Sequence, residues 1–97
     1  MNVKKMQRAA ADVSNVMRVL SHPGRLMVLC HLAEGEKSVG DLARSLGMRD
    51  AAMSQQLSLL RRDGLVDTRR DGHTIFYALA RQDVKHLLAF LYATYCR

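Results

Sequence analysis

The sequence predicts a mainly α-helical α+β protein, with four helices, a β-hairpin and a final helix in one domain that spans residues 1–97. In most of the chain, apolar residues recur at three- and four-residue intervals, the spacing that gives a helix one buried face. Two short runs rich in β-branched and aromatic residues flank the dipeptide Asp71-Gly72, which is a strong hairpin signal. With 97 residues and no linker rich in Pro, Gly or Ser, the chain is too short for two separate cores.

The first two helices are predicted from their apolar spacing and their capping residues. Residues 4–20 form the first helix in this prediction. Ser21 is expected to cap the second helix, since its hydroxyl can accept a backbone N–H and Pro23 is tolerated in a first turn. Gly35 is expected to end the second helix, because glycine readily adopts the left-handed closing conformation.

The next two helices are short and are separated by a tight turn. Ser38 is expected to cap the third helix and Gly47 to end it. Asp50 is expected to cap the fourth helix. The hairpin follows, with Asp71-Gly72 in a type I′ turn because that pair accepts positive φ angles. Helical spacing returns near residue 81 and predicts the last helix.

The fourth helix has two chemically unlike faces on a helical wheel. One face is largely apolar and is expected to be buried; it consists of Ala52, Met53, Gln56, Leu57, Leu59 and Leu60. Gln56 is expected to make a structural hydrogen bond there. The other face is short and polar, and consists of Asp50, Ala51, Ser54, Gln55, Ser58, Arg61 and Arg62. A helix that enters the major groove of DNA needs such residues, although an ordinary surface helix fits this segment equally well.

The elements around the fourth helix favour DNA binding. A short helix, a tight turn and a second helix with a polar face predict a helix-turn-helix, and the hairpin after it predicts a wing. Arginines at a hairpin tip are also common as plain solvated residues. We expect DNA contacts from the polar helix face, its flanks and the wing, namely from Lys37, Arg49, Ala51, Ser54, Gln55, Ser58, Arg62, Arg69, Arg70, His73 and Thr74.

The charge balance agrees with a polyanionic partner. The chain has 15 Lys and Arg against 9 Asp and Glu, and its net charge of +6 favours nucleic acid or an acidic membrane surface. The apolar runs at residues 26–30 and 87–92 are far shorter than the ~20 residues of a bilayer span, so no membrane partner is expected. The N-terminus has no signal-peptide stretch, and we therefore expect a cytoplasmic location.

Four motifs resemble those of the ArsR family of bacterial transcriptional repressors. They are HPGR at the start of the second helix, SVGDLARSLG, MSQQLSLLRRDGLV and RRDGHTIFYAL. The resemblance extends over residues 13–96. It implies a winged helix-turn-helix homodimer, built mainly by the first and last helices, that covers promoter DNA and releases it when an inducer binds.

The terminal helices carry more apolar surface than a protomer of this length easily hides, which independently favours pairing. The alternative is that these residues pack on the protomer's own core. We expect the dimer interface to include Met6, Val13, Val84, Leu88, Leu91 and Tyr95. A two-fold dimer places its recognition helices one DNA turn apart, so the expected partner is double-stranded operator DNA with an inverted repeat and half-sites ~34 Å apart.

The metal ligands of ArsR-family sensors are largely missing from this sequence. Where many relatives have a pattern similar to Cys-Val-Cys, this chain has Ser38, Val39 and Gly40. The last helix offers only Asp83 and His86, whereas a tight zinc or nickel site needs three or four ligands. We therefore expect no metal and no cofactor.

Cys30 and Cys96 are the only cysteines, and in a reducing compartment they serve as structural thiols, metal ligands or a redox pair. Their contexts, LMVLCHL and LYATYC, resemble those of the BigR and SqrR type within the ArsR family. That resemblance implies a sensor in which one thiol reacts with a reactive sulfur species or an oxidant, and the other then closes a covalent link between two helices. Local sequence alone favours plain buried thiols, because the helical neighbours of Cys30 include no positive charge.

The sequence leaves two other functions open. One is a repressor of the same family that senses a metal or another ligand, and the other is a winged-helix module that binds protein and no DNA. An enzyme is not expected, because no nucleophile stands beside an activating base and an oxyanion site.

Overall fold

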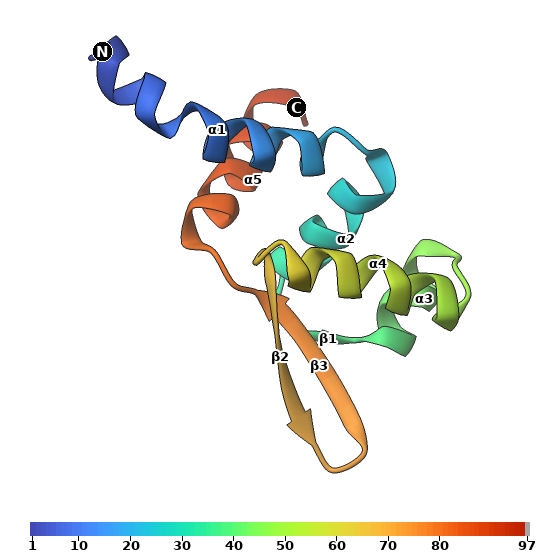
Figure 1. Cartoon of the computed structure of the whole chain (residues 1–97). Coiled ribbons are helices and arrows are strands. Elements are labelled where there is room, and N and C mark those ends of the chain that lie inside the picture. The colour runs from blue at the N-terminus through green and yellow to red at the C-terminus, as the bar shows by residue number, and fades with distance from the viewer. Residues whose placement is uncertain (97) are drawn as a thin grey trace.

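The computed structural model describes residues 1–96 and has the predicted order of elements, with one short strand added (Figure 1). The helices are α1 (Val3–Leu20), α2 (Pro23–Ala33), α3 (Val39–Leu46), α4 (Asp50–Arg62) and α5 (Gln82–Tyr95). The strands are β1 (Lys37–Ser38), β2 (Val66–Asp71) and β3 (Thr74–Leu79). The prediction of a mainly helical α+β fold is confirmed.

All five of these helices contribute to one hydrophobic core. The buried apolar residues are Val16, Val19, Val28, Leu29, Leu32, Leu42, Ala43, Met53, Leu57, Leu60, Leu65, Val66, Tyr77, Val84 and Leu88. Aliphatic side chains dominate this set, and Tyr77 of β3 is its one aromatic member. The base of the hairpin is therefore packed on the same core that holds α4.

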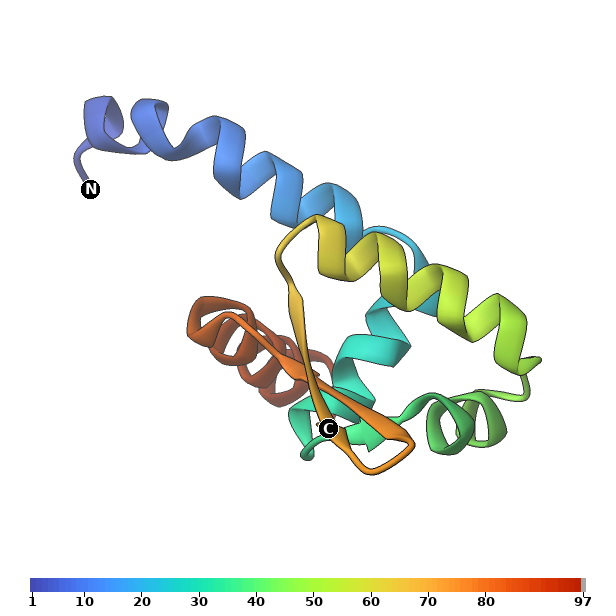
Figure 2. The same cartoon turned by 60° about the horizontal axis from the view of Figure 1, so that its bottom comes forward.

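Helix α1 enters the hydrophobic core only through its C-terminal turns. Val16 and Val19 enter the core, whereas residues 1–14 are all exposed. Figure 2 shows the N-terminal part of this helix extending beyond the rest of the molecule. Most of the length of α1 is therefore unsupported by its own protomer.

The junction between α1 and α2 differs from the prediction. Ser21 closes α1, where its backbone N–H donates to the Arg18 carbonyl. The N-cap of α2 is His22, whose Nδ1 accepts hydrogen bonds from the backbone N–H groups of Gly24 and Arg25 at 3.1 and 3.3 Å. Pro23 explains the shift: the residue before a proline is driven to an extended backbone, as at His22 with φ −98° and ψ 119°, and a cap requires that conformation.

The ends of α3 match the prediction, but the start of α4 does not. Ser38 Oγ accepts a hydrogen bond from the Asp41 N–H, and Gly47 ends α3 with φ 64°. In α4, Asp50 is the first helical residue and Arg49 is the N-cap, without a side-chain hydrogen bond. Asp50 therefore contributes a negative charge to the positive end of the helix dipole instead of a cap.

The sheet is antiparallel with strand order β1-β3-β2. The pairing of Asp71 with Thr74 leaves Gly72 and His73 as the two central residues of the hairpin turn. A type I′ turn needs positive φ at both central residues, whereas here Gly72 has φ 63° and His73 has no positive φ. The hairpin is confirmed, but the predicted type I′ turn centred on Asp71-Gly72 is wrong.

Two glycines of the helix-turn-helix provide a matched stability test. Gly47→Ala should lower the free energy of unfolding by about 1–2 kcal/mol, because alanine is strained at φ 64° even though no atom lies within 4 Å of the added Cβ. Gly40→Ala, inside α3, should instead raise it by about 0.5–1 kcal/mol. Urea denaturation at one fixed protomer concentration measures both. Equal effects at the two positions would contradict this assignment of the turn.

Candidate DNA interface and cysteine cavity

Helix α4 presents its polar face to solvent because its opposite face is fixed in the core. Met53, Leu57 and Leu60 are buried. The buried face is narrower than predicted, since Ala52 and Leu59 are exposed. Every member of the predicted polar face is exposed: Asp50, Ala51, Ser54, Gln55, Ser58, Arg61 and Arg62. Short polar side chains on an outward helix allow close approach to base edges.

Basic side chains flank this face at both ends of α4. Arg49 precedes the helix and Arg62 ends it, and both are exposed. Helix α3 lies beside α4, and the hairpin of β2 and β3 extends away from the helices as a wing (Figure 1). Lys37 lies in β1 at the base of the sheet and is half-buried.

The wing tip carries the remaining predicted DNA contacts. Arg70, His73 and Thr74 are exposed. Arg69 is also exposed, but its guanidinium is already paired with the carboxylate of Glu36. The structure therefore places the two wing arginines in different surroundings, which no local sequence signal indicated.

Within residues 1–96, the side-chain oxygen of Gln56 lacks the structural hydrogen bond that was expected from the sequence. It lies on the inner side of α4 and is half-buried, and its Oε1 is buried without a partner among the described residues. The side chain is directed at the start of α2, because a Cβ added at Gly24 would lie 3.7 Å from Gln56 Nε2. Gln56 is therefore a contact between α2 and α4 and is turned away from the exposed polar face of α4.

The two cysteines line one cavity, although they lie far apart in the sequence. Cys30 is half-buried on α2, and Cys96 is exposed at the C-cap of α5. Both are free thiols and both line a cavity of about 360 Å³ between these helices. The other lining residues are apolar or aromatic: Leu26, Met27, Leu88, Leu91, Tyr92 and Tyr95.

The cavity changes the acidity of its inner thiol. Burial raises the pKa of Cys30 above the ordinary value of a thiol, and the nearby Cys96 sulfur raises it further. Burial disfavours the thiolate because a charge loses its hydration there, and a second sulfur anion nearby adds repulsion. Cys30 is therefore mostly a neutral thiol near neutral pH, and its reactivity must grow as the pH rises.

Comparison with known proteins identifies the family. Residues 22–68 match the family described as "Bacterial regulatory protein, arsR family". The chain is also 46% identical over 91 residues to the biofilm growth-associated repressor of Agrobacterium fabrum, across 94% of this chain and 78% of the relative. This chain belongs to the ArsR family. It is accordingly a DNA-binding transcriptional regulator.

Solved structures of ArsR-type proteins agree over nearly the whole chain. The crystal structure of the transcriptional repressor BigR from Xylella fastidiosa matches with a TM-score of 0.92 and 42% identity, covering 100% of this chain and 99% of that one. A homodimeric winged helix-turn-helix DNA-binding domain from Mycobacterium bovis matches with a TM-score of 0.79 and 34% identity, covering 92% and 83%. The predicted winged helix-turn-helix fold is confirmed.

The terminal helices of this ArsR-family protein expose only part of the predicted dimer seam. Val84 and Leu88 are 1% and 5% exposed, so they belong to the core of the protomer and do not form an outward stripe with Tyr95. Leu91 is half-buried. The large apolar residues that the two helices do expose are Val3, Met6, Val13, Met17, Phe90, Tyr92 and Tyr95.

An ion-pair network joins α1 to the start of α5 and was not anticipated. Arg81 Nη2 lies 3.2 Å from Asp12 Oδ2 and 2.7 Å from Asp83 Oδ2. The hydrogen bond from Arg81 lowers the pKa of Asp83. Asp83, one of the two potential metal ligands of the last helix, is thus paired with an arginine. The other, His86, has its Nε2 atom 3.1 Å from the side-chain amide nitrogen of Gln82.

The apolar lining of the cysteine cavity was not predicted from the sequence. Leu26 lies one helical turn before Cys30, and Tyr92 lies one turn before Cys96. This i, i+4 spacing places each pair on one helix face, so it was the available signal. Across residues 1–96, no three His, Cys, Asp or Glu side chains gather as a metal-binding group. No helix in that range is long and apolar enough to cross a membrane.

The acidity of Cys30 gives a test of the cavity. The rate of Cys30 alkylation by iodoacetamide should rise with pH to a midpoint above that of free N-acetylcysteine, because only the thiolate reacts. In Cys96→Ser the midpoint should fall, since the repulsion is removed, but it should stay above the reference because burial persists. Peptide mass spectrometry follows the reaction at this residue. An unchanged or higher midpoint in Cys96→Ser would show that the two sulfurs do not interact.

Proposed function

We propose that this protein is a dimeric transcriptional repressor that leaves its operator when Cys30 and Cys96 are covalently linked by reactive sulfur species or oxidant. The observation that carries the sensing part is that both thiols line one apolar cavity between α2 and α5. We place the repressor in the cytoplasm, where its promoter DNA and a reducing thiol pool are found.

The DNA-binding part of the proposal uses α4 as the recognition helix. Ala51, Ser54, Gln55 and Ser58 face outward in the first three turns, so their small and polar side chains approach the base edges. Basic and polar groups supply contacts to the phosphates, which orient the protein without reading sequence. These groups belong to Lys37, Arg49 and Arg62 and to the wing residues Arg70, His73 and Thr74.

The dimer part of the proposal rests on the apolar surface that the protomer leaves exposed. Met6 of α1 is 44% exposed and Tyr95 of α5 is 78% exposed. The exposed aromatic rings of Phe90 and Tyr92 add to the apolar surface near the C-terminal end of α5. Exposed apolar surface of this kind on terminal helices is stabilised by a second copy. The homodimeric relative from Mycobacterium bovis supports this assembly. A two-fold dimer then reads an inverted repeat with half-sites ~34 Å apart.

The sensing chemistry proceeds by thiolate attack. Cys96 is the more exposed thiol, so it meets the donor first. Its thiolate attacks the outer sulfur of a hydropersulfide RS–SH, the S–S bond of the donor breaks, and RS⁻ leaves as Cys96–S–SH forms. Cys30 reacts in the same way with a second hydropersulfide, giving Cys30–S–SH and a second RS⁻. The deprotonated persulfide of Cys30 then attacks the inner sulfur of Cys96–S–SH, HS⁻ leaves, and the trisulfide Cys30–S–S–S–Cys96 forms. Two hydropersulfides are thus the oxidant, and two thiols and one H₂S are the reduced products. A polysulfide link tolerates a larger separation than the ~5.5 Å between Cα atoms that suits a disulfide.

The link changes DNA binding by favouring a different position of α5. Leu29 and Leu32 fix α2 in the core on either side of Cys30, whereas Cys96 lies at the exposed end of α5. A covalent bond therefore draws the end of α5 toward α2. Because α5 also carries part of the proposed dimer surface, this movement changes the spacing of the two recognition helices, which is a population shift between two states.

Operator binding should depend steeply on salt. Each phosphate contact contributes about 0.9 to the slope of log affinity against log salt, so Arg62→Ala should lower the slope by about that amount. Lys4→Ala removes the same charge at the projecting end of α1 and should leave the slope unchanged. Fluorescence anisotropy with a labelled promoter fragment measures both. A flat salt response of the wild type would favour a module that binds protein and no DNA.

A hydropersulfide donor should release the wild type from the operator and leave Cys30→Ser and Cys96→Ser bound. The expected loss of affinity is roughly 5- to 150-fold, the range of ordinary allosteric coupling. Mass spectrometry should find Cys30 joined to Cys96 with added sulfur, and dithiothreitol should restore binding. Peroxide in a parallel titration distinguishes the two classes of signal. Release of both serine variants by the donor would exclude a thiol sensor, and release by micromolar zinc would indicate metal sensing.

A further inference from the structure

The two adjacent arginines of the wing are not equivalent. Arg70 is exposed and has no ion-pair partner within residues 1–96. Arg69 Nη2 lies 2.5 Å from Glu36 Oε1, and Arg69 Nε lies 3.2 Å from both oxygens of that carboxylate. The guanidinium carbon of Arg69 also lies 4.9 Å from the centroid of the Phe76 ring. Arg69 is therefore held from two sides.

The register of the sheet produces this arrangement. Phe76 of β3 is paired with Ser38 of β1 on one side and with Arg69 of β2 on the other. The side chains of paired residues lie on the same face of a sheet. Side chains alternate between the two faces along a strand, so a residue two positions away lies on that face as well. Glu36, two positions before Ser38, therefore meets Arg69 across the Phe76 ring.

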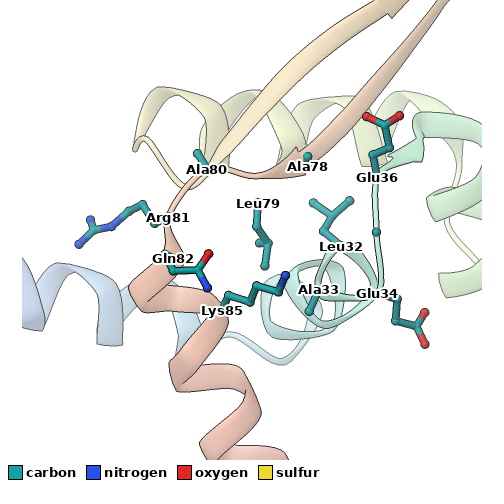
Figure 3. A pocket seen from close by; sticks show the side chains of 11 residues that line it. Leu32, Ala33, Glu34, Glu36, Ala78, Leu79, Ala80, Arg81, Gln82 and Lys85 are labelled. Atoms are coloured by element: carbon teal, nitrogen blue, oxygen red, sulfur yellow. The ribbon is translucent and has the colours of Figure 1, made fainter.

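The contact joins β2 to the residue just before β1, and these two strands are not neighbours in the sheet. In the order β1-β3-β2, β2 is the outer strand of the wing and β1 is only two residues long. Figure 3 shows Glu36 on the segment that leaves α2 on its way to β1. The ion pair spans β3 and ties the outer strand to the segment that leads into α3. An otherwise projecting two-stranded hairpin is only marginally stable in water, so such a tie restrains it.

On the basis of the DNA binding proposed above, we propose that Arg69 is a positioning residue of the wing and not a ligand of a DNA phosphate. Glu36 and the Phe76 ring hold Arg69, and Arg69 in turn sets the angle of the wing relative to α3 and α4. Arg70 is then the arginine of the wing that contacts phosphate. This assignment replaces the expectation that both arginines contact DNA.

A phosphate would have to compete with the carboxylate already bound to Arg69. Arginine presents its donors in a fixed planar fork, and two of its nitrogens are used by Glu36. The hydrogen bond from Arg69 lowers the pKa of Glu36, so this carboxylate stays negative and repels an approaching phosphate. An exposed ion pair alone contributes little, but paired donors stacked on an aromatic ring restrict the side chain further.

Operator binding of four variants at several salt concentrations tests the assignment. Arg69→Ala and Glu36→Gln should each weaken binding by about threefold to fivefold at every salt concentration, with the salt slope unchanged. Arg69→Lys should behave like Arg69→Ala, because lysine keeps the charge but lacks the planar fork. The matched control Arg70→Ala should lower the slope by about 0.9, since one phosphate contact is lost.

Two results would overturn the assignment. If Arg69→Ala lowers the salt slope by about 0.9, Arg69 is itself a phosphate ligand. If Glu36→Gln strengthens binding, Glu36 competes with DNA for Arg69 instead of positioning it. In the Arg69→Ala background, Glu36→Gln should cause no further loss of affinity, because the tie is already broken; additive losses would mean that the two residues act separately.

Measurements on the protein without DNA separate positioning from general stability. Amide hydrogen exchange in β2 should be faster in Arg69→Ala and Glu36→Gln than in Arg70→Ala, while the thermal midpoint of all three stays that of the wild type. A midpoint that falls in step with the affinity would reduce Arg69 to a stability residue. If the wild type does not bind the operator, or binds it without salt dependence, the proposed function is wrong. If the wild type binds with a steep salt dependence but Arg69→Ala lowers the slope, only the Arg69 assignment is wrong.

Discussion

The proposed DNA surface depends on the burial of one side of α4. Met53, Leu57 and Leu60 are almost completely buried in the core. Burial of each such side chain contributes roughly 1.5–3 kcal/mol to the stability of the fold. Only one rotation of the helix satisfies all three, and that rotation turns Ser54 and Gln55 outward. The outward residues contribute nothing to the core. Their identity is therefore free to follow the operator without loss of the fold.

The same core connects the cysteine cavity to the proposed DNA surface. Helix α2 carries Cys30 and packs on α1, α3, α5 and β3, so it is the central element of the protomer. Its start also meets α4 through Gln56, and its end leads through Glu36 to the wing. A firmly held α2 gives the thiol on α5 a fixed partner to react with.

The elements were predictable because each long helix must bury one face, and the spacing of its apolar residues records that need. Strand β1 was missed because two residues carry no periodicity. The N-cap of α2 was assigned to Ser21 because hydroxyl side chains are the usual caps. The stronger constraint is that Pro23 drives the residue directly before it, His22, to the extended backbone that a cap requires. The pairing of Cys30 with Cys96 was expected only from family resemblance, and the apolar cavity around them was not predicted. The Glu36–Arg69 pair joins residues 33 positions apart, and no local pattern announces it.

The long unsupported part of α1 has a consequence for how much regulator a cell must keep. A free helical segment of this length is marginal in water, because nucleating it is costly and little packing offsets that cost. In the proposed dimer, the segment is ordered only as subunits meet, so the ordered fraction follows mass action. Dilution of the protein during growth would then destabilise this helix and release the promoter without any chemical signal. The cellular concentration of the regulator thereby becomes a second input to the switch.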